Sequence, residues 1–261
     1  MTLEGFTRGD FSDAGVQRPI YRRGVGPGVL VIHETPGITP QVAAFGRRVA
    51  DAGFTAVLPS LFGTPGRGYG LNVVAQLARA CVAREFHVLA RRGSSPIVAW
   101  LRALARELHA ELGGPGVGAL GMCITGNFAL TLMLDPWVIA PVLCQPSLPF
   151  ALTADLGRAV HLSDADLARA GQRCAAEGVA VLGVRFTADF MCPRARFDTL
   201  RAALGPGFEA IEIDSGPGNP HGIPRWAHSV LTRDLVDETG HPTRAALERV
   251  LEFLRERLLT T

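Results

Sequence analysis

Residues 117–134, VGALGMCITGNFALTLML, constrain the fold of this chain more than any other stretch. A short apolar run ends in a turn of small residues, and an apolar segment with helical spacing follows. A strand, a tight turn and a helix in this order place Cys123 at the carboxyl edge of a sheet and at a helix N-terminus. The positive end of the helix favours a reactive thiolate there. The pattern predicts a nucleophile, although a cysteine in an apolar run can also be an inert core residue.

Other apolar segments extend this pattern over the chain. Continuous apolar runs predict buried parallel strands at residues 29–32, 55–58, 117–120, 138–143, 179–186 and 208–213. Apolar residues at helical spacing predict helices at 41–52, 73–89, 97–112, 164–176, 194–204 and 243–259. The polar segment 7–23 forms at most an edge hairpin. This alternation predicts an α/β fold: a single doubly wound domain over residues 1–261, with a mostly parallel central sheet flanked by helices.

Three less regular segments need a separate interpretation. The glycine-rich string at 24–28 precedes a strand instead of following one, so it predicts a loop and not a dinucleotide site. Residues 60–95 and 145–178 are irregular or helical excursions between core strands, and such excursions often contact substrate.

Composition and charge exclude several classes of protein. Hydrophobic residues make up 48% of the chain and charged residues 19%, which is enough apolar material for a large core. The net charge of +2 and the lack of a basic run predict no nucleic-acid partner. No apolar stretch predicts a membrane span or a secretion signal. Five cysteines at irregular spacings favour reduced thiols in the cytoplasm, and neither a metal nor an organic cofactor is predicted.

Polar residues at the predicted carboxyl ends of the strands form a candidate site. They are Glu34, Cys123, Asp189 and, after the last strand, His221 and His228. Open parallel sheets carry functional groups at this edge. A nucleophile, then an acid, then a histidine is the chain order of one type of hydrolytic triad. In such a triad a thiolate attacks a carbonyl, an imidazole transfers the proton, and a carboxylate orients the imidazole.

Five strings in the expected order resemble the dienelactone hydrolases, a branch of the α/β-hydrolase superfamily that uses a cysteine nucleophile. They are VIHETPGIT, AGFTAVLPSLFG, GMCITG, FTADFMCP and AHSVLT, within residues 28–258. The resemblance implies a hydrolase that opens a lactone or small ester through an acyl-enzyme.

The resemblance also implies a role for each matching residue. Cys123 would be the nucleophile, Asp189 the acid and His228 the base. Glu34 would contact the nucleophile, where a carboxylate opposes thiolate formation until substrate displaces it. The backbone N–H groups of Ile124 and Thr35 would form the oxyanion hole.

Two departures from the family pattern bear on these roles. Thr125 stands where the family elbow has glycine, and glycine follows one residue later. The family binds its substrate carboxylate with arginines, for which Arg84, Arg225 and Arg233 are candidates here. Two aromatic residues are further candidates for lining the pocket: Trp226 and Phe190.

Alternatives remain at each position. Asp189 could cap the helix that begins near Pro193, His221 is a rival base, and Glu34 could simply pair with an arginine. The whole chain could be a non-catalytic α/β-hydrolase-fold module that binds a ligand or a protein. A serine esterase is disfavoured because the chain contains no Gly-x-Ser-x-Gly string.

Overall fold

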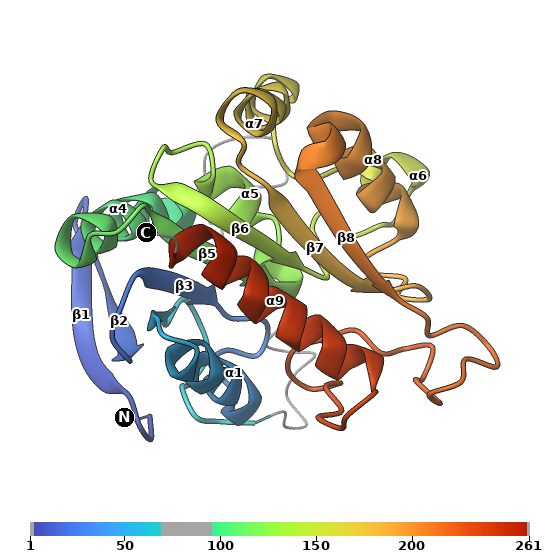
Figure 1. The fold of residues 1–261 in the computed structure, drawn as a ribbon, viewed down its shortest axis with the longest axis horizontal. Coiled ribbons are helices and arrows are strands. Elements are labelled where there is room, and N and C mark those ends of the chain that lie inside the picture. Colours follow the sequence, from blue (N-terminus) through green and yellow to red (C-terminus); the bar gives the residue numbers. More distant parts are fainter. Residues whose placement is uncertain (1–2, 69–95, 260–261) are drawn as a thin grey trace.

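An eight-stranded sheet organises the chain in a computed structural model that describes residues 3–68 and 96–259 (Figure 1). The spatial order is β1-β2-β4-β3-β5-β6-β7-β8. The strands are β1 (Thr7–Asp13), β2 (Val16–Arg23), β3 (Gly28–Ile32), β4 (Thr55–Pro59), β5 (Val117–Met122), β6 (Val138–Cys144), β7 (Val181–Phe186) and β8 (Phe208–Ile213).

The sheet is parallel from β4 to β8 and antiparallel at one edge. The hairpin β1–β2 adds to β4 in antiparallel register, with Ile20 opposite Pro59. In the parallel part, β3 pairs with β4 on one side and with β5 on the other. The chain therefore reverses its direction of strand addition between β3 and β5, and ligands bind at such a switch point in open α/β sheets.

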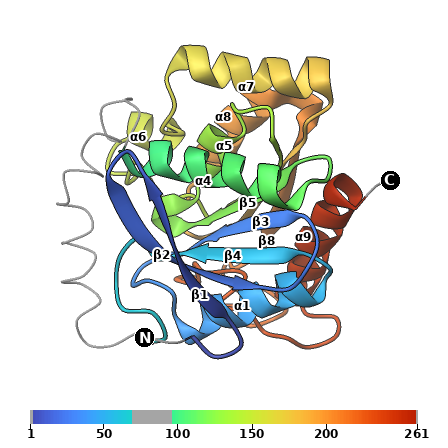
Figure 2. The ribbon, with the colours of Figure 1, turned by 90° about the vertical axis from the view of Figure 1, so that its left-hand side faces the viewer.

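Helices cover both faces of the sheet. Those described are α1 (Pro40–Asp51), α4 (Pro96–Leu112), α5 (Phe128–Leu132), α6 (Ala154–Arg158), α7 (Asp164–Glu177), α8 (Arg194–Leu204) and α9 (Pro242–Leu258). The helices α1 and α9 lie on one face, and α4, α5, α7 and α8 lie on the other (Figure 2). This arrangement is an α/β sandwich of three layers.

Two hydrophobic cores follow from the pleat of the strands. Successive side chains of β3 point to opposite faces, so Val29 and Val31 pack with α1 and α9, while Leu30 and Ile32 pack with α4. Every residue of β3, β4, β5 and β7 is buried, which explains why these strands are largely apolar; Arg185 in β7 and Thr55 in β4 are buried polar exceptions.

Most predicted elements are confirmed. All six predicted strands, the edge hairpin and the loop at 24–28 are present, although β7 begins at Val181 and not at residue 179. Five of the predicted helices are present with small shifts at their ends. The sixth, at 73–89, lies outside the described residues, as does much of the excursion at 60–95.

The excursion at 145–178 contains one helix that the sequence pattern did not predict. The helix α6 has only five residues, too few to show an apolar period. Thr153 caps it, because the Thr153 hydroxyl accepts a hydrogen bond from the Leu156 N–H at 3.2 Å.

Candidate active site

Cys123 lies at a strained turn directly after β5. Its φ of +55° is in the left-handed region, which residues other than glycine rarely adopt. It begins one turn of 3₁₀ helix, Cys123–Thr125, and α5 follows with only five residues. The helix is thus shorter than the apolar segment predicted, and strain at the turn is the stronger mark of a functional position. The Cys123 side chain keeps some contact with solvent, at 7% exposure.

Glycines at both ends of this turn allow close backbone packing. A Cβ on Gly121 would lie 2.1 Å from the Thr125 carbonyl oxygen. A Cβ on Gly126 would lie 2.6 Å from the Cα of Pro146. Real side chains do not approach so closely, so these two positions hold the turn against the strand and against the segment after β6.

Asp189 and His228 meet beside this turn. The Oδ2 atom of Asp189 lies 2.6 Å from Nδ1 of His228, and both side chains are buried. The other carboxylate oxygen of Asp189 accepts the Met191 N–H at 2.9 Å. Asp189 is therefore not the cap of α8, whose N-cap is Pro193.

The environment of His228 favours its charged form. Burial opposes the charge, but the sulfur of Cys123 and the carboxylate of Asp189 outweigh it and raise the pKa of His228 to about 10. The backbone N–H groups of His228 and Ser229 both donate to Oδ2 of Asp234 at 2.8 Å, which fixes the loop that carries the imidazole.

Glu34 follows β3 and reaches the same loop. Its Oε2 accepts a hydrogen bond from the Ser229 hydroxyl at 2.7 Å, and its Oε1 accepts one from the Thr232 hydroxyl. The carboxylate is buried, at 1% exposure. The structure thus joins the end of β3 to the residues that follow His228.

The neighbour of Glu34, His33, is a packing residue. The His33 Nε2 atom accepts the Leu61 N–H at 3.1 Å, so Nδ1 carries the proton and donates to the Glu34 carbonyl oxygen at 2.9 Å. Complete burial lowers the pKa of His33 to about 4, which keeps the ring neutral. The ring stacks edge-on against Phe62.

A serine that the sequence analysis did not single out lies between the sulfur and the imidazole. The Oγ atom of Ser147 is 3.5 Å from Sγ of Cys123 and 3.2 Å from Nε2 of His228. Ser147 comes three residues after the end of β6. Extending the search for polar residues to the carboxyl end of that strand would have found it.

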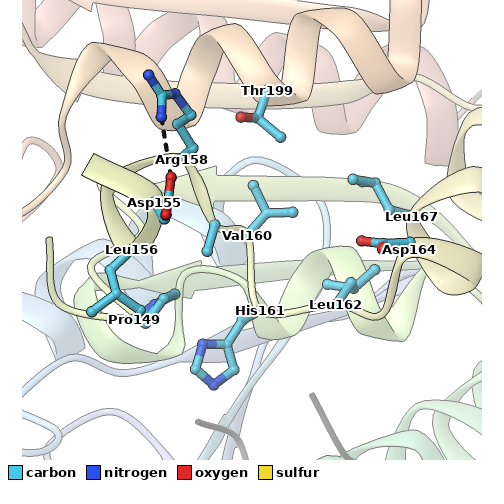
Figure 3. A pocket seen from close by; sticks show the side chains of 11 residues that line it. Pro149, Asp155, Leu156, Arg158, Val160, His161, Leu162, Asp164, Leu167 and Thr199 are labelled. Atoms are coloured by element: carbon cyan, nitrogen blue, oxygen red, sulfur yellow. Dashed lines mark hydrogen bonds and ion pairs between the residues drawn. The ribbon is translucent and has the colours of Figure 1, made fainter. Parts of the chain in front are cut away.

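A separate cavity of about 310 Å³ lies between α6, α7 and α8 (Figure 3). Its apolar wall includes Leu156, Val160 and Leu162, and Thr199 on α8 faces Val160 across it. None of the residues lining it belongs to the cluster around Cys123. His161 also lines it, and burial lowers the pKa of His161 to about 4.

The sequence matches the model of the dienelactone hydrolase family over residues 17–258, which is nearly the whole chain. The chain belongs to the dienelactone hydrolase family. This is a family of carboxylic ester hydrolases, as the five sequence strings implied. A search of curated proteins found no match.

Solved structures of low identity share the fold of this family member. A dienelactone hydrolase-like promiscuous phosphotriesterase from metagenomic libraries is 18% identical with a TM-score of 0.62, covering 97% of this chain and 98% of its own. A cold-adapted esterase from an Arctic intertidal metagenomic library is 14% identical with a TM-score of 0.58, covering 99% and 97%. Acetyl xylan esterase 1 from Thermoanaerobacterium sp. is 14% identical with a TM-score of 0.52, covering 97% and 85%. At these identities the likeness shows the fold alone.

The hydrogen bonds of Thr125 explain how a threonine fits where the family elbow has glycine. Its buried hydroxyl accepts the Met122 N–H at 3.0 Å and lies within hydrogen-bond distance of the carbonyl oxygens of Met122, Ile32 and His33. The branched side chain therefore does not loosen the elbow expected in a dienelactone hydrolase. It links the turn after β5 to the end of β3.

The other candidate residues are the rival base and the arginines that could bind a substrate carboxylate. His221 is exposed and its ring lies 5.2 Å from that of His241, whereas His228 contacts Asp189. Arg225 is exposed, and Arg233 forms an ion pair with Asp234 at 2.8 Å. Arg84 lies outside the described residues.

Two aromatic side chains flank the Asp189–His228 pair. Phe190 follows Asp189 in the chain and is 73% exposed, and Trp226 precedes His228 by two residues and is 75% exposed. Both are exposed and close in sequence to Asp189 or His228, so both remain candidates for substrate contact.

Two further observations concern membranes and metals. None of the helices within 3–68 and 96–259 is long and apolar enough to cross a membrane. In the part of the chain that the structure describes, no three His, Cys, Asp or Glu side chains are grouped as a metal site requires.

Proposed function

We propose that this chain hydrolyses a lactone or a small ester through an acyl-enzyme on Cys123, with His228 as the base and Asp189 as the acid that orients it. The observation that carries the proposal is the hydrogen-bonded pair of Asp189 and His228 beside the sulfur of a cysteine with positive φ. This combination supplies a nucleophile, a proton carrier and an orienting carboxylate.

The reaction would proceed in two halves. The thiolate of Cys123 attacks the carbonyl carbon, a C–S bond forms, and the C–O bond of the ester breaks as His228 gives its proton to the leaving alkoxide. His228 then takes a proton from water, whose oxygen attacks the thioester and releases the acid. The backbone N–H groups of Ile124 and Thr35 would stabilise the oxyanion in both halves.

Ile124 and Thr35 are suited to this role by their positions. Ile124 is the second residue of the 3₁₀ turn, where an N–H has no partner within the helix. Thr35 follows Glu34 at the end of β3, and β3 lies next to β5 in the sheet. The two N–H groups thus come from the two loops on either side of the switch point.

Glu34 would have two effects on the site. Its hydrogen bonds to Ser229 and Thr232 orient the loop that carries His228. As a buried negative charge at the same sheet edge, it would also oppose a second negative charge on Cys123 until substrate is bound.

Side chains around the pair would contact the substrate. Phe190 and Trp226 would contact its apolar part, since both are exposed and lie within two residues of Asp189 and His228 in the chain. Arg225 would bind a substrate carboxylate, and Arg84 and Arg233 remain weaker candidates because one lies outside the described residues and the other pairs with Asp234.

A reducing location, such as the cytoplasm, belongs to the same proposal. Cys123, Cys144, Cys174 and Cys192 are all free thiols. Free thiols of this kind persist where thioredoxin and glutathione keep cysteines reduced.

Hydrolysis of p-nitrophenyl acetate and of a dienelactone by wild type, Cys123→Ala and Cys123→Ser tests the proposal. We expect wild type to hydrolyse at least one compound and Cys123→Ala to hydrolyse neither. The rate with the dienelactone measures how well the family's substrate serves as a substrate of this chain. Activity that survives Cys123→Ala would overturn the nucleophile assignment. If wild type turns over neither compound and iodoacetamide does not label Cys123, the chain is instead a binding module of the same fold.

A further inference from the structure

Backbone hydrogen bonds fix Ser147 next to Cys123 and His228. Gln145, the first residue after β6, has a φ of +34°, and its N–H donates to the Val184 carbonyl oxygen of β7 at 2.7 Å. The Ser147 N–H then donates to the Cys123 carbonyl oxygen at 3.0 Å. The side chain has no exposed surface. Its hydroxyl therefore has few positions to adopt.

The Ser147 hydroxyl has three polar neighbours and one proton. It lies 3.2 Å from Nε2 of His228, 3.5 Å from Sγ of Cys123 and 3.0 Å from the Gln145 carbonyl oxygen. When the imidazole is charged, its Nε2–H can only donate, so the hydroxyl oxygen accepts that hydrogen bond. The Gln145 carbonyl oxygen and the negatively charged sulfur then compete for the hydroxyl proton, and the charge on the sulfur favours the bond to Cys123.

A hydroxyl is the one small group that can serve both charges at once. It accepts from the imidazolium and donates to the thiolate, and hydrogen bonds to charged groups are stronger than neutral ones. Such a bridge stabilises the ion pair relative to the neutral thiol and imidazole. Cys123 keeps 7% exposure and Ser147 none, so Cys123, and not Ser147, is the residue that a substrate can reach.

We propose that Ser147 is a positioning residue that bridges the imidazolium of His228 and the thiolate of Cys123 and so favours the reactive thiolate over the neutral thiol, against the opposing charge of Glu34. This inference rests on the proposed function and extends it. Removing the hydroxyl would leave both charged partners in place but without their shared hydrogen-bonding group.

Other charged groups around the pair stay the same when Ser147 is changed. Asp189 contacts His228, Asp234 holds the His228 backbone, and Glu34 lies at the end of β3. The guanidinium of Arg196 donates to the Pro146 carbonyl oxygen, one residue before Ser147. The Cys144 thiol is buried, and burial raises its pKa. None of these side chains is a partner of the Ser147 hydroxyl. A change in the pH midpoint of Cys123 thiolate formation when the hydroxyl is removed therefore reports the loss of the bridge.

The test is the pH dependence of the Cys123 thiolate in wild type, Ser147→Ala and Ser147→Gly. Ultraviolet thiolate absorbance is measured across pH and corrected with the matching Cys123→Ala protein. We expect the midpoint of thiolate formation to move up by about one pH unit in both variants that lack the hydroxyl. The acid limb of kcat/KM for p-nitrophenyl acetate should move by the same amount.

Two further variants separate positioning from folding. Ser147→Thr keeps a hydroxyl and should restore the wild-type midpoint. If the extra methyl group prevents folding, the test rests on Ser147→Ala and Ser147→Gly, whose midpoints should move up by the same amount. Ser163→Ala removes a different serine hydroxyl, at the N-cap of α7, and should leave the midpoint unchanged.

A Ser147→Ala midpoint equal to that of wild type would overturn the inference, and so would an equal shift in Ser163→Ala. The outcome is independent of the proposed function. If ester hydrolysis survives Cys123→Ala but the midpoint still shifts, the function falls and the bridge stands. If Cys123→Ala abolishes hydrolysis and the midpoint does not shift, the bridge falls and the function stands.

Discussion

The hydroxyl of Thr125 connects two segments that must stay together for any chemistry at this edge of the sheet. It lies 3.0 Å from the Ile32 carbonyl oxygen, 93 residues earlier in the chain. Since a hydroxyl has a single proton, it serves one of its three carbonyl neighbours at a time while it accepts the Met122 N–H. A glycine at this position would leave the link to β3 unmade.

We expect the loss of this hydroxyl to destabilise the protein more than the loss of its methyl group. Thr125→Val keeps the shape but leaves the buried Met122 N–H and the carbonyls without their partner, which costs about 1–3 kcal/mol. Thr125→Ser keeps the hydroxyl and costs about 0.8 kcal/mol for one methyl group. Urea denaturation of both variants measures the difference, and equal costs would argue against the hydrogen-bonded link.

The charge on His228 makes a second prediction, for the pH dependence of stability. Its pKa is raised from 6.5 to about 10, so its charge stabilises the fold fully below pH 6.5 and this contribution is lost as the pH rises toward 10. The free energy of unfolding of wild type should therefore exceed that of His228→Gln by a margin that shrinks over this range.

Urea denaturation across this pH range measures that margin. His221→Gln is the matched control, because His221 is exposed and lies away from Asp189. The difference in free energy of unfolding between wild type and His221→Gln should not shrink with rising pH in the same way. A wild-type advantage that grows with pH would contradict the assignment of charge to His228.

At the scale of elements, Arg196 connects α8 to the excursion after β6. Its buried guanidinium donates to five carbonyl oxygens, which belong to Pro146, Pro149, Leu156, Ala159 and Met191. Four of these carbonyls belong to the excursion after β6 and the fifth, that of Met191, to the loop after β7, and all converge on one side chain. This explains how the chain keeps Ser147 in place beyond the end of β6.

This arrangement shows why the sequence predicted some elements better than others. The helix at 194–204 was predicted from its apolar period, and the period arises from the same burial that the structure shows. The conformation of 145–163 depends on contacts with Arg196, which is distant in sequence, and no local pattern records such contacts. For this reason the contacts of Ser147 with Cys123 and His228 were not predicted, although Asp189 and His228 were identified as candidates.

Arg196→Lys should be strongly destabilising. Lysine is a point charge with three donors and cannot reproduce the planar fork of arginine, so several buried carbonyls lose their partner. We expect a loss of about 2–4 kcal/mol in the free energy of unfolding. Faster amide hydrogen exchange should appear in residues 146–160.

Arg194→Lys on the same helix is the control for this prediction. The Arg194 side chain is 79% exposed and pairs only loosely with Asp198, at 3.6 Å. We expect a change within about 0.5 kcal/mol, as for other surface positions. If both variants lost the same stability, the buried carbonyl contacts would not be the cause.

At the scale of the whole molecule, the topology assembles the site. The groups around Cys123 come from loops after β3, β5, β6, β7 and β8, which are spread over some two hundred residues but end at one edge of the sheet. The sequence analysis located this edge from strand runs alone, since parallel strands place their carboxyl ends together. It could not supply distances, because these depend on packing in both cores.

Burial in the two hydrophobic cores also determines which thiols can react. Cys144 and Cys192 have no exposed surface, and burial raises the pKa of both thiols. Iodoacetamide should therefore label Cys123 in the native protein and reach Cys144 and Cys192 only after unfolding in urea. Mass spectrometry of alkylated peptides measures this, and native labelling of Cys192 would contradict the packing around Asp189.

The position of α9 has a consequence for how this chain is made in the cell. Its inward face covers β5, β6, β7 and β8 with a set of buried residues, namely Thr243, Ala246, Leu247, Val250, Phe253, Leu254 and Leu258. The ribosome synthesises all eight strands before this helix. During that time the part of this face that α1 does not cover exposes apolar side chains, so the nascent chain is prone to aggregate until α9 leaves the exit tunnel.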